Sequence, residues 1–182
     1  MSEFTDKELL EKFRIAGTQH YAFNLIVRKY QQKIYYHIRR LVIDHDDTND
    51  VVQNTFIKAW KGLDNFREDS QLFTWLYRIA TNEALTFIKQ RKSKYFSPMG
   101  DVEESMLNNL VADKGIDVNK LELKLLQAIA KLPEQQRIIF SMRYYDEIKY
   151  EDMSQILGVT VGGLKASYHH AVKKIEKMIT GS

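Results

Sequence analysis

The sequence predicts an all-α fold in which two small helical domains are joined by a flexible linker. Proline and glycine are scarce, at 2 and 8 of 182 residues, which favours long helices over a turn-rich β fold. Apolar residues recur at helical spacing along most of the chain. Residues 93–118 break this pattern and carry mostly negative charges. We therefore expect one domain over residues 1–92 and a second over residues 119–182.

Four helices are expected in the first domain. Residues 6–16 form a short amphipathic helix, and residues 20–41 carry a longer apolar stripe on one side. The third helix has its apolar residues between positions 51 and 60. A connection over residues 62–71 leads to the fourth helix, over residues 72–92.

The acidic stretch before the third helix raises the question of a metal site. Asp44 and Asp46 fit the first and third positions of a calcium loop, but Asn49 stands where the loop needs glycine. Thr55 replaces the bidentate glutamate. We therefore reject a calcium site and interpret Asp47 as the N-cap of the third helix. The sequence predicts neither a metal nor a cofactor.

The second domain is predicted to end in a helix-turn-helix. One helix covers residues 120–132, and Pro133 suits the first turn of the next helix. After a further short helix, Gly158 suits a left-handed stop and Thr160 can cap the last helix. A helix-turn-helix lays its second helix in the DNA major groove. The alternative is an ordinary helical hairpin with a solvated basic face.

Composition narrows the class of protein. The absence of cysteine excludes disulfides, thiol nucleophiles and cysteine zinc sites, and it fits a reducing cytosol. No apolar run is long enough to span a membrane, and the amino terminus lacks a signal-peptide pattern. We therefore expect a cytoplasmic protein without membrane insertion. The net charge of +3 is too small to indicate a nucleic-acid partner by itself.

Three segments carry a resemblance to a known family. They are residues 47–60 (DTNDVVQNTFIKAW), residues 65–82 (NFREDSQLFTWLYRIATN) and residues 132–144 (LPEQQRIIFSMRY), the last followed by the helix-turn-helix. In this order and spacing the chain resembles bacterial RNA polymerase sigma factors of the extracytoplasmic-function group. The resemblance implies a factor that directs the polymerase core to specific promoters and has no enzymatic activity. It also implies regulation by an anti-sigma factor.

The first segment is expected to bind the polymerase. Its polar residues recur at i, i+3, i+4 and i+8, which makes one exposed helix face. A solvated face would look the same, but the family uses this helix to grip a coiled-coil of the largest polymerase subunit. The expected polymerase contacts are Asp50, Gln53, Asn54 and Lys58.

The second segment is expected to open the promoter at the minus-ten element. Pulling bases from the stack costs a few kcal/mol, which aromatic, amide and cationic groups on the protein can offset. Leu76 and Ile79 are expected in the core, and Trp75 suits either role. The expected minus-ten residues are Ser70, Gln71, Leu72 and Phe73 in the base-capturing loop, with Arg78 and Asn82 on the following helix.

The helix-turn-helix is expected to read the minus-thirty-five element, with three departures from the family pattern. Lys149 stands where the family commonly has a serine cap, Gly162 and Gly163 begin the recognition helix, and Ser167 replaces a frequent arginine. The missing cap and the two glycines are expected to weaken the starts of their helices. Ser167 affects sequence preference rather than DNA binding. The expected contacts are Thr160, Lys165, Ser167, Tyr168, His169 and Lys173.

Two other functions remain open. A free-standing helix-turn-helix regulator would bind an operator tightly without polymerase. A helical hydrolase would use the aspartate cluster and His45, but the chain offers no nucleophile–base pair, glycine-rich phosphate loop or complete metal set.

Overall fold

The computed structural model describes residues 4–42, 44–94 and 120–181, without the side chains of residues 92–94 and 120. All regular secondary structure in this part of the chain is helical, which confirms the predicted all-α class. Most of the linker predicted at residues 93–118 lies outside the described residues. The helices are α1 (Asp6–Arg14), α2 (Gln19–Val42), α3 (His45–Leu63), α4 (Leu72–Lys94), α6 (Lys120–Ala130), α7 (Glu134–Tyr144), α8 (Tyr150–Leu157) and α9 (Val161–Thr180).

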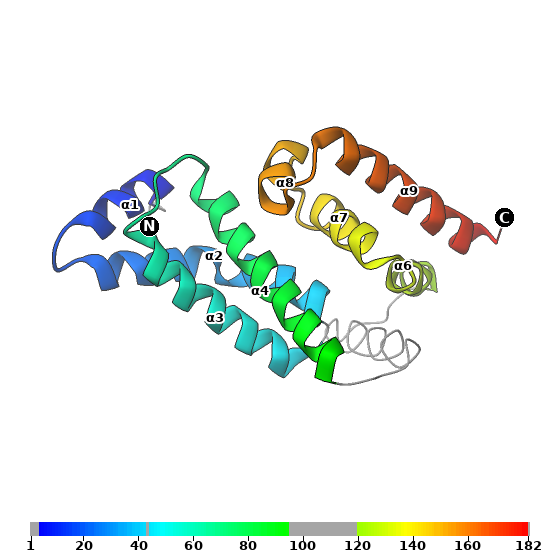
Figure 1. Cartoon of the computed structure of the whole chain (residues 1–182), viewed down its shortest axis with the longest axis horizontal. Coiled ribbons are helices and arrows are strands. Elements are labelled where there is room, and N and C mark those ends of the chain that lie inside the picture. The colour runs from blue at the N-terminus through cyan, green and yellow to red at the C-terminus, as the bar shows by residue number, and fades with distance from the viewer. Residues whose placement is uncertain (1–3, 43, 95–119, 182) are drawn as a thin grey trace.

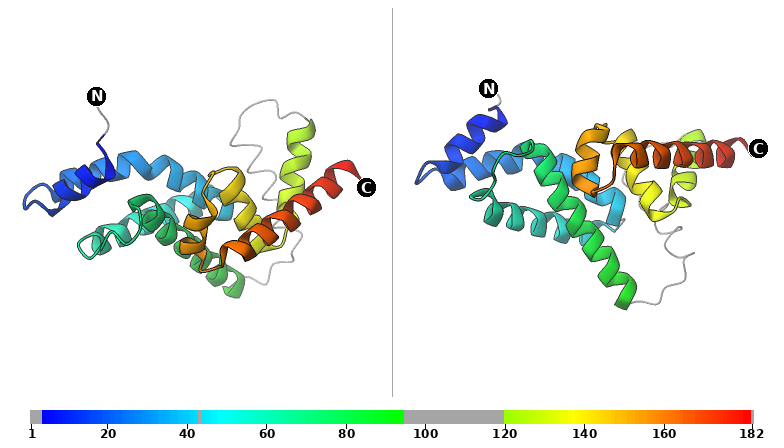
Figure 2. Two further views of the ribbon diagram at one scale, coloured as in Figure 1. Left: turned by 90° about the horizontal axis from the view of Figure 1, so that it is seen from above. Right: turned by 45° about the horizontal axis from the view of Figure 1, so that its top comes forward.

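The helices form two groups that touch (Figure 1). In the first group, α2, α3 and α4 pack against one another and α1 covers α2. In the second group, α9 packs along α6, α7 and α8. Helix α8 also lies against α4, and α7 lies against α2, so the two groups share an interface; α8 stays beside α4 in the further views of Figure 2.

The first group is held by the apolar stripes that the sequence predicts. Ile26, Ile34 and Ile38 of α2 are fully buried against Ala59 of α3 and Leu76 of α4. Their spacing of four or eight residues keeps them on one face of α2. Burial of each large aliphatic side chain contributes about 1.5–3 kcal/mol.

The start of α3 differs from the prediction. Its N-cap is Asp44, whose carboxylate accepts hydrogen bonds from the backbone N–H groups of Asp46 and Asp47 at 2.9 and 3.0 Å. The interpretation of Asp47 as the N-cap is therefore wrong. Asp44 has the extended backbone that a cap requires, with φ −84° and ψ 142°. Asp47 instead lies in the first turn and forms an ion pair with Arg91 of α4 at 2.7 Å.

The helix-turn-helix follows its predicted layout. Pro133 lies one position earlier than expected, as the N-cap of α7. Lys149 gives α8 no side-chain cap, as predicted. Gly158 ends α8 with a left-handed φ of 68°, and the Thr160 hydroxyl accepts a hydrogen bond from Gly163 N–H at 3.2 Å. These two residues fix the turn between α8 and α9.

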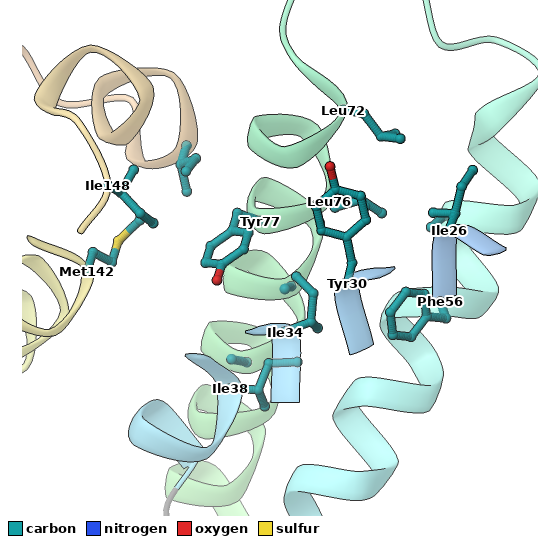
Figure 3. Packing of buried hydrophobic residues seen from close by; sticks show 14 of the residues in the cluster. Ile26, Tyr30, Ile34, Ile38, Phe56, Leu72, Leu76, Tyr77, Met142 and Ile148 are labelled. Carbon is teal, nitrogen blue, oxygen red and sulfur yellow. The ribbon is translucent and has the colours of Figure 1, made fainter. Parts of the chain in front are cut away.

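One hydrophobic core runs through both groups of helices. Met142 of α7 and Ile148 of the following turn are buried in the same cluster as Ile34, Leu76 and Tyr77 of the first group. Figure 3 shows Met142 and Ile148 across from Tyr77 in this cluster. A second, smaller cluster lies within the second group and consists of Ala128, Ile129, Leu132, Phe140, Ala171 and Ile175.

Candidate nucleic-acid and polymerase interfaces

The loop between α3 and α4 is built on two aromatic rings. Phe66 is buried beneath the loop, and its ring centroid lies 5.0 Å from that of Trp75. Gly62 makes room for this pair, because a Cβ there would lie 3.1 Å from the Trp75 ring. Glu68 has a left-handed φ of 59° and forms an ion pair with Arg14 at 2.6 Å. The loop is thus anchored to α1, α3 and α4.

A pocket of about 400 Å³ opens beside this loop. Its aromatic residues are Phe66 and Trp75, and its cationic residues are Arg67 and Arg78. Its size falls at the lower end of the usual range for small-ligand sites. The complete lining is Asn65, Phe66, Arg67, Asp69, Ser70, Trp75, Arg78 and Gln155.

The predicted minus-ten residues take different positions around this pocket. Ser70 and Arg78 line it, and Gln71 is exposed beside it. Phe73 is half-buried, with its ring centroid 4.3 Å from that of Tyr77. Leu72 is only 2 % exposed and lies in the core, where it anchors the first turn of α4.

Asn82 lies outside the pocket. It is exposed on α4 four residues after Arg78, so both side chains lie on the same face of the helix. Leu76 lies in the core as predicted, whereas Trp75 serves both the core and the pocket.

Besides Phe66 and Trp75, four further pocket residues were not among the predicted contacts. Asn65, Arg67 and Asp69 belong to the segment of residues 65–82 that carries the family resemblance. Their position in this segment could have identified them as candidates for the minus-ten site. Gln155 comes from α8 in the other group of helices. Nothing in its local sequence indicates this position, because it depends on how the two groups pack.

The predicted polymerase-binding residues form one exposed face of α3. Asp50, Gln53, Asn54 and Lys58 are all exposed, while Val51 is buried on the opposite side. Ile57 lies among the four and is 45 % exposed, which gives the face an apolar centre. The Lys58 ammonium forms an ion pair with Glu83 of α4.

The first turn of α3 belongs to the same surface. Burial raises the pKa of the Asp47 carboxyl, although the nearby Arg91 guanidinium acts in the opposite direction. The ion pairs of Asp47 with Arg91 and of Lys58 with Glu83 both join α3 to α4. The exposed face of α3 is therefore joined by two ion pairs to the helix that carries Arg78 and Asn82.

The outer side of α9 presents a basic stripe. Lys165, His169 and Lys173 are exposed at i, i+4 and i+8, so they lie along one face. Ser167 is half-buried at the edge of this stripe. Thr160 is exposed at the start of α9, where its hydroxyl serves as the N-cap.

Tyr168 lies on the inner side of α9. Its ring stacks on Phe140 with centroids 5.7 Å apart and an interplanar angle of 12°. It also meets the edge of the Tyr150 ring, at 6.4 Å between centroids. Burial raises the pKa of the Tyr168 hydroxyl. This tyrosine therefore helps to hold α9 on α7 and α8.

Comparison with protein-family models matches Sigma-70 region 2 to residues 26–94 and Sigma-70 region 4 to residues 122–175. The first match contains the loop, the pocket helix α4 and the outer face of α3. The second match contains the helix-turn-helix up to Ile175 of α9. In the described part of the chain no helix is long and apolar enough to cross a membrane.

Curated relatives match over nearly their full length. The RNA polymerase sigma-H factor of Pseudomonas aeruginosa is 33% identical, covering 98% of this chain and 96% of the relative. The ECF RNA polymerase sigma-E factors of Salmonella typhimurium and Escherichia coli are each 33% identical, covering 98% of this chain and 97% of the relative.

Solved structures have the same fold. CnrH, in complex with the cytosolic domain of CnrY, aligns with a TM-score of 0.69 at 21% identity, over 97% of this chain and 98% of that chain. The sigma factor RpoE of Bartonella quintana, in complex with the anti-sigma factor NepR, aligns with a TM-score of 0.66 at 21% identity, over 87% and 96%. The chain belongs to the extracytoplasmic-function group of the sigma-70 family, the sigma factors that direct RNA polymerase core to specific promoters and initiate transcription.

Proposed function

We propose that three surfaces of the protein each perform one step of transcription initiation. The exposed face of α3 docks on the coiled-coil of the largest polymerase subunit. The pocket beside α4 captures a base of the minus-ten element. The basic stripe of α9 reads the minus-thirty-five element. In this proposal the protein acts in the cytoplasm, where polymerase and promoter DNA are found, and catalyses no reaction itself.

The pocket is the observation that carries the proposal. Extruding a base from duplex DNA costs a few kcal/mol, and stacking on an aromatic side chain returns about 1–3 kcal/mol. Trp75 and Phe66 offer aromatic surface, while Arg67 and Arg78 supply charge for the phosphates. Ser70 supplies a hydroxyl that can hydrogen-bond a base edge.

Run-off transcription with purified core polymerase on candidate promoters tests the whole proposal. The protein should give specific initiation, and its absence under conditions where a known sigma factor works would refute the assignment. Arg78→Ala should reduce opening of the minus-ten region, measured by permanganate reactivity of unpaired thymines. Arg28→Ala is the matched control, because Arg28 is an exposed arginine of α2 away from the pocket lining.

Asn82 can be tested separately from polymerase binding. Asn82→Ala should impair promoter opening while leaving the affinity for core polymerase unchanged, because the side chain lies on α4 rather than on the docking face of α3. An equal loss in the opening and binding assays would contradict this role.

Substitutions on the exposed face of α3 should impair binding to core polymerase, whereas those on α4 should impair promoter opening. Gln53→Ala should weaken binding to core polymerase, and Gln32→Ala, at an exposed glutamine of α2, should not. Charged groups steer association, whereas most substitutions in an interface act through the dissociation rate. Because Gln53 is neutral, we expect its variant to show the defect mainly in the dissociation rate.

The same surfaces distinguish a sigma factor from a free-standing regulator. Each domain is small and can neutralise few phosphates, so the isolated protein should hold duplex DNA weakly. A gel-shift experiment with and without core polymerase separates the two functions. Tight operator binding by the protein alone would favour the regulator.

We also propose control by an anti-sigma factor. The support is the fold shared with RpoE of Bartonella quintana, which was solved with such a protein bound. A pull-down from the native host should recover a protein that blocks binding to core polymerase, and a pull-down without one would contradict the proposal.

A further inference from the structure

The outer face of α9 carries a different set of residues from the one that the sequence predicted. Ser167 is half-buried at its edge, and Tyr168 packs inward on Phe140. Ala166 and His170 were not among the expected contacts, yet both are exposed in the first half of α9. The side chains that α9 offers to a DNA groove therefore have to include these two.

Ala166 lies near the centre of the outer face. Leu164, Ala171 and Ile175 are buried and mark the side of α9 that packs on the other helices. At about 3.6 residues per turn, Ala166 stands about 200° around the helix axis from Leu164 and about 140° from Ala171. It therefore points away from the rest of the second group, in the direction that a recognition helix presents to the major groove.

Four exposed polar side chains surround this alanine. His169, His170 and Lys173 follow it by three, four and seven residues, so they share its side of the helix. The two imidazole centroids lie 6.2 Å apart. Lys165 directly precedes Ala166 and is exposed as well. A rim of basic and hydrogen-bonding groups thus encloses one small apolar side chain.

The two glycines in the first turn of α9 have different surroundings. A Cβ on Gly163 would lie 3.2 Å from Thr160 Oγ1 and 3.3 Å from Val159 Cγ1, so this glycine makes room for the cap. A Cβ on Gly162 would meet no atom within 4 Å, and its backbone is not left-handed. Neither packing nor backbone conformation therefore requires glycine at position 162. Gly162 stands four residues before Ala166, so it leaves the same side of the helix bare.

A bare first turn followed by a single methyl group suits thymine. Thymine differs from the other bases in the major groove by its 5-methyl group, and alanine is one of the side chains that contact this group. Without a side chain at Gly162, the backbone of α9 can approach DNA closely. A close approach is what the short side chain of Ala166 needs to reach the edge of a base.

We propose that Ala166 is a specificity-determining residue, which selects a thymine of the minus-thirty-five element through contact between its methyl group and the 5-methyl group of the base. Gly162 lets α9 lie deep enough in the groove for this contact. The inference rests on the proposed function, because it assigns a base to the helix that is proposed to read this element. Lys165 and Lys173 then supply charge for the phosphates on either side.

The preferred element can be identified by selection. Core polymerase carrying the native chain is used to select duplex DNA from a library of random sequence, and alignment of the selected molecules defines the minus-thirty-five element. We expect this element to contain at least one thymine. An element without thymine would overturn the inference. Failure of the complex to select any upstream element would instead refute the proposed function.

Deoxyuridine gives the decisive measurement, because it pairs as thymine does and lacks only the 5-methyl group. Replacing one particular thymine should weaken binding of the native complex about fourfold, as expected for the loss of one buried methyl group. The complex with Ala166→Gly should bind the thymine and deoxyuridine duplexes equally. Comparing the two duplexes within each variant cancels any loosening of α9 by the new glycine. Methyl sensitivity at no thymine, or equal sensitivity in the variant, would overturn the inference.

Gly162→Leu tests the close approach separately. The variant should unfold at the same temperature as the native protein, because its Cβ meets open space. It should bind the selected element about tenfold more weakly, a loss similar to that of a mismatched base pair. Gln127→Leu, at an exposed glutamine of α6, is the matched control and should bind as the native protein does. Native-like binding by Gly162→Leu would overturn the close approach on which the methyl contact depends.

Discussion

The indole of Trp75 lies against the ring of Phe66, with centroids 5.0 Å apart and an interplanar angle of 39°. Both rings line the pocket next to Arg78, and Phe66 is itself buried. The pair thus connects the hydrophobic core to the surface where a base is proposed to bind. Changes that move the indole should affect promoter opening more than they affect folding.

Gly62→Ala is a direct test of this relationship. The added Cβ would lie 3.1 Å from the Trp75 ring, so the indole must shift by a few tenths of an ångström. Overpacking costs about 1–3 kcal/mol, whereas replacing a helical glycine with alanine returns about 0.5–1 kcal/mol. We expect a net loss of at most about 2.5 kcal/mol in the free energy of unfolding, measured with denaturant. Permanganate reactivity at the minus-ten element should fall by a larger factor than the loss of folded protein alone would produce.

Helical periodicity predicted the fold because each helix buries one apolar stripe. The same rule placed Ile26, Ile34 and Ile38 on the inner face of α2, where the structure has them. Tyr168 follows the same spacing, since it stands four residues after Leu164 and three before Ala171, both buried. That spacing places the tyrosine on the inner stripe of α9, a signal that was present in the sequence.

Other features depended on information outside the local pattern. Several aspartates near the start of α3 can serve as caps, and Asp44 takes the role because its backbone is extended where α3 begins. The contribution of Gln155 to the pocket follows from the packing of α8 on α4. No rule of periodicity or capping determines that packing, so the pocket could be predicted only on its α3–α4 side.

Substitutions in α9 should separate folding from DNA binding. Tyr168→Ala removes the ring that stacks on Phe140 and should lower stability, by less than the about 3–5 kcal/mol of a fully buried aromatic ring because Tyr168 is half-buried. Tyr168→Phe keeps the stack and should change little. The Lys165 ammonium lies 5.7 Å from the centroid of the Tyr150 ring, so Lys165→Ala should lower stability by at most about 0.5–1 kcal/mol. It should weaken binding to a minus-thirty-five duplex and reduce its salt dependence by about one phosphate contact. Denaturant unfolding and salt-dependent fluorescence anisotropy measure the two effects.

The uncapped start of α8 offers a stabilising change. Lys149 already has the backbone of an N-cap, with φ −67° and ψ 149°, but its side chain makes no capping hydrogen bond. Lys149→Ser should supply one and raise the free energy of unfolding by about 1 kcal/mol. Thr160→Ala should lower it by a similar amount, since the hydroxyl now caps α9. Thermal unfolding of both variants tests the pair. Lys131→Ser, at an exposed lysine outside the helices, controls for the loss of charge.

Alkaline pH should lower the free energy of unfolding through the buried hydroxyl of Tyr77. Burial, and secondarily the nearby Asp146 carboxylate, raise the pKa of this hydroxyl well above its ordinary value. The folded protein therefore keeps a proton that the unfolded chain loses at its ordinary pKa of about 10. This contribution to stability is complete below about pH 10 and declines as the pH rises towards the folded pKa. Denaturant unfolding between pH 8 and pH 11 should show a steeper loss for the native protein than for Tyr77→Phe. Tyr21→Phe, at a tyrosine that is 56% exposed, should keep the native slope; if it flattens the slope as much as Tyr77→Phe does, burial of Tyr77 is not the cause.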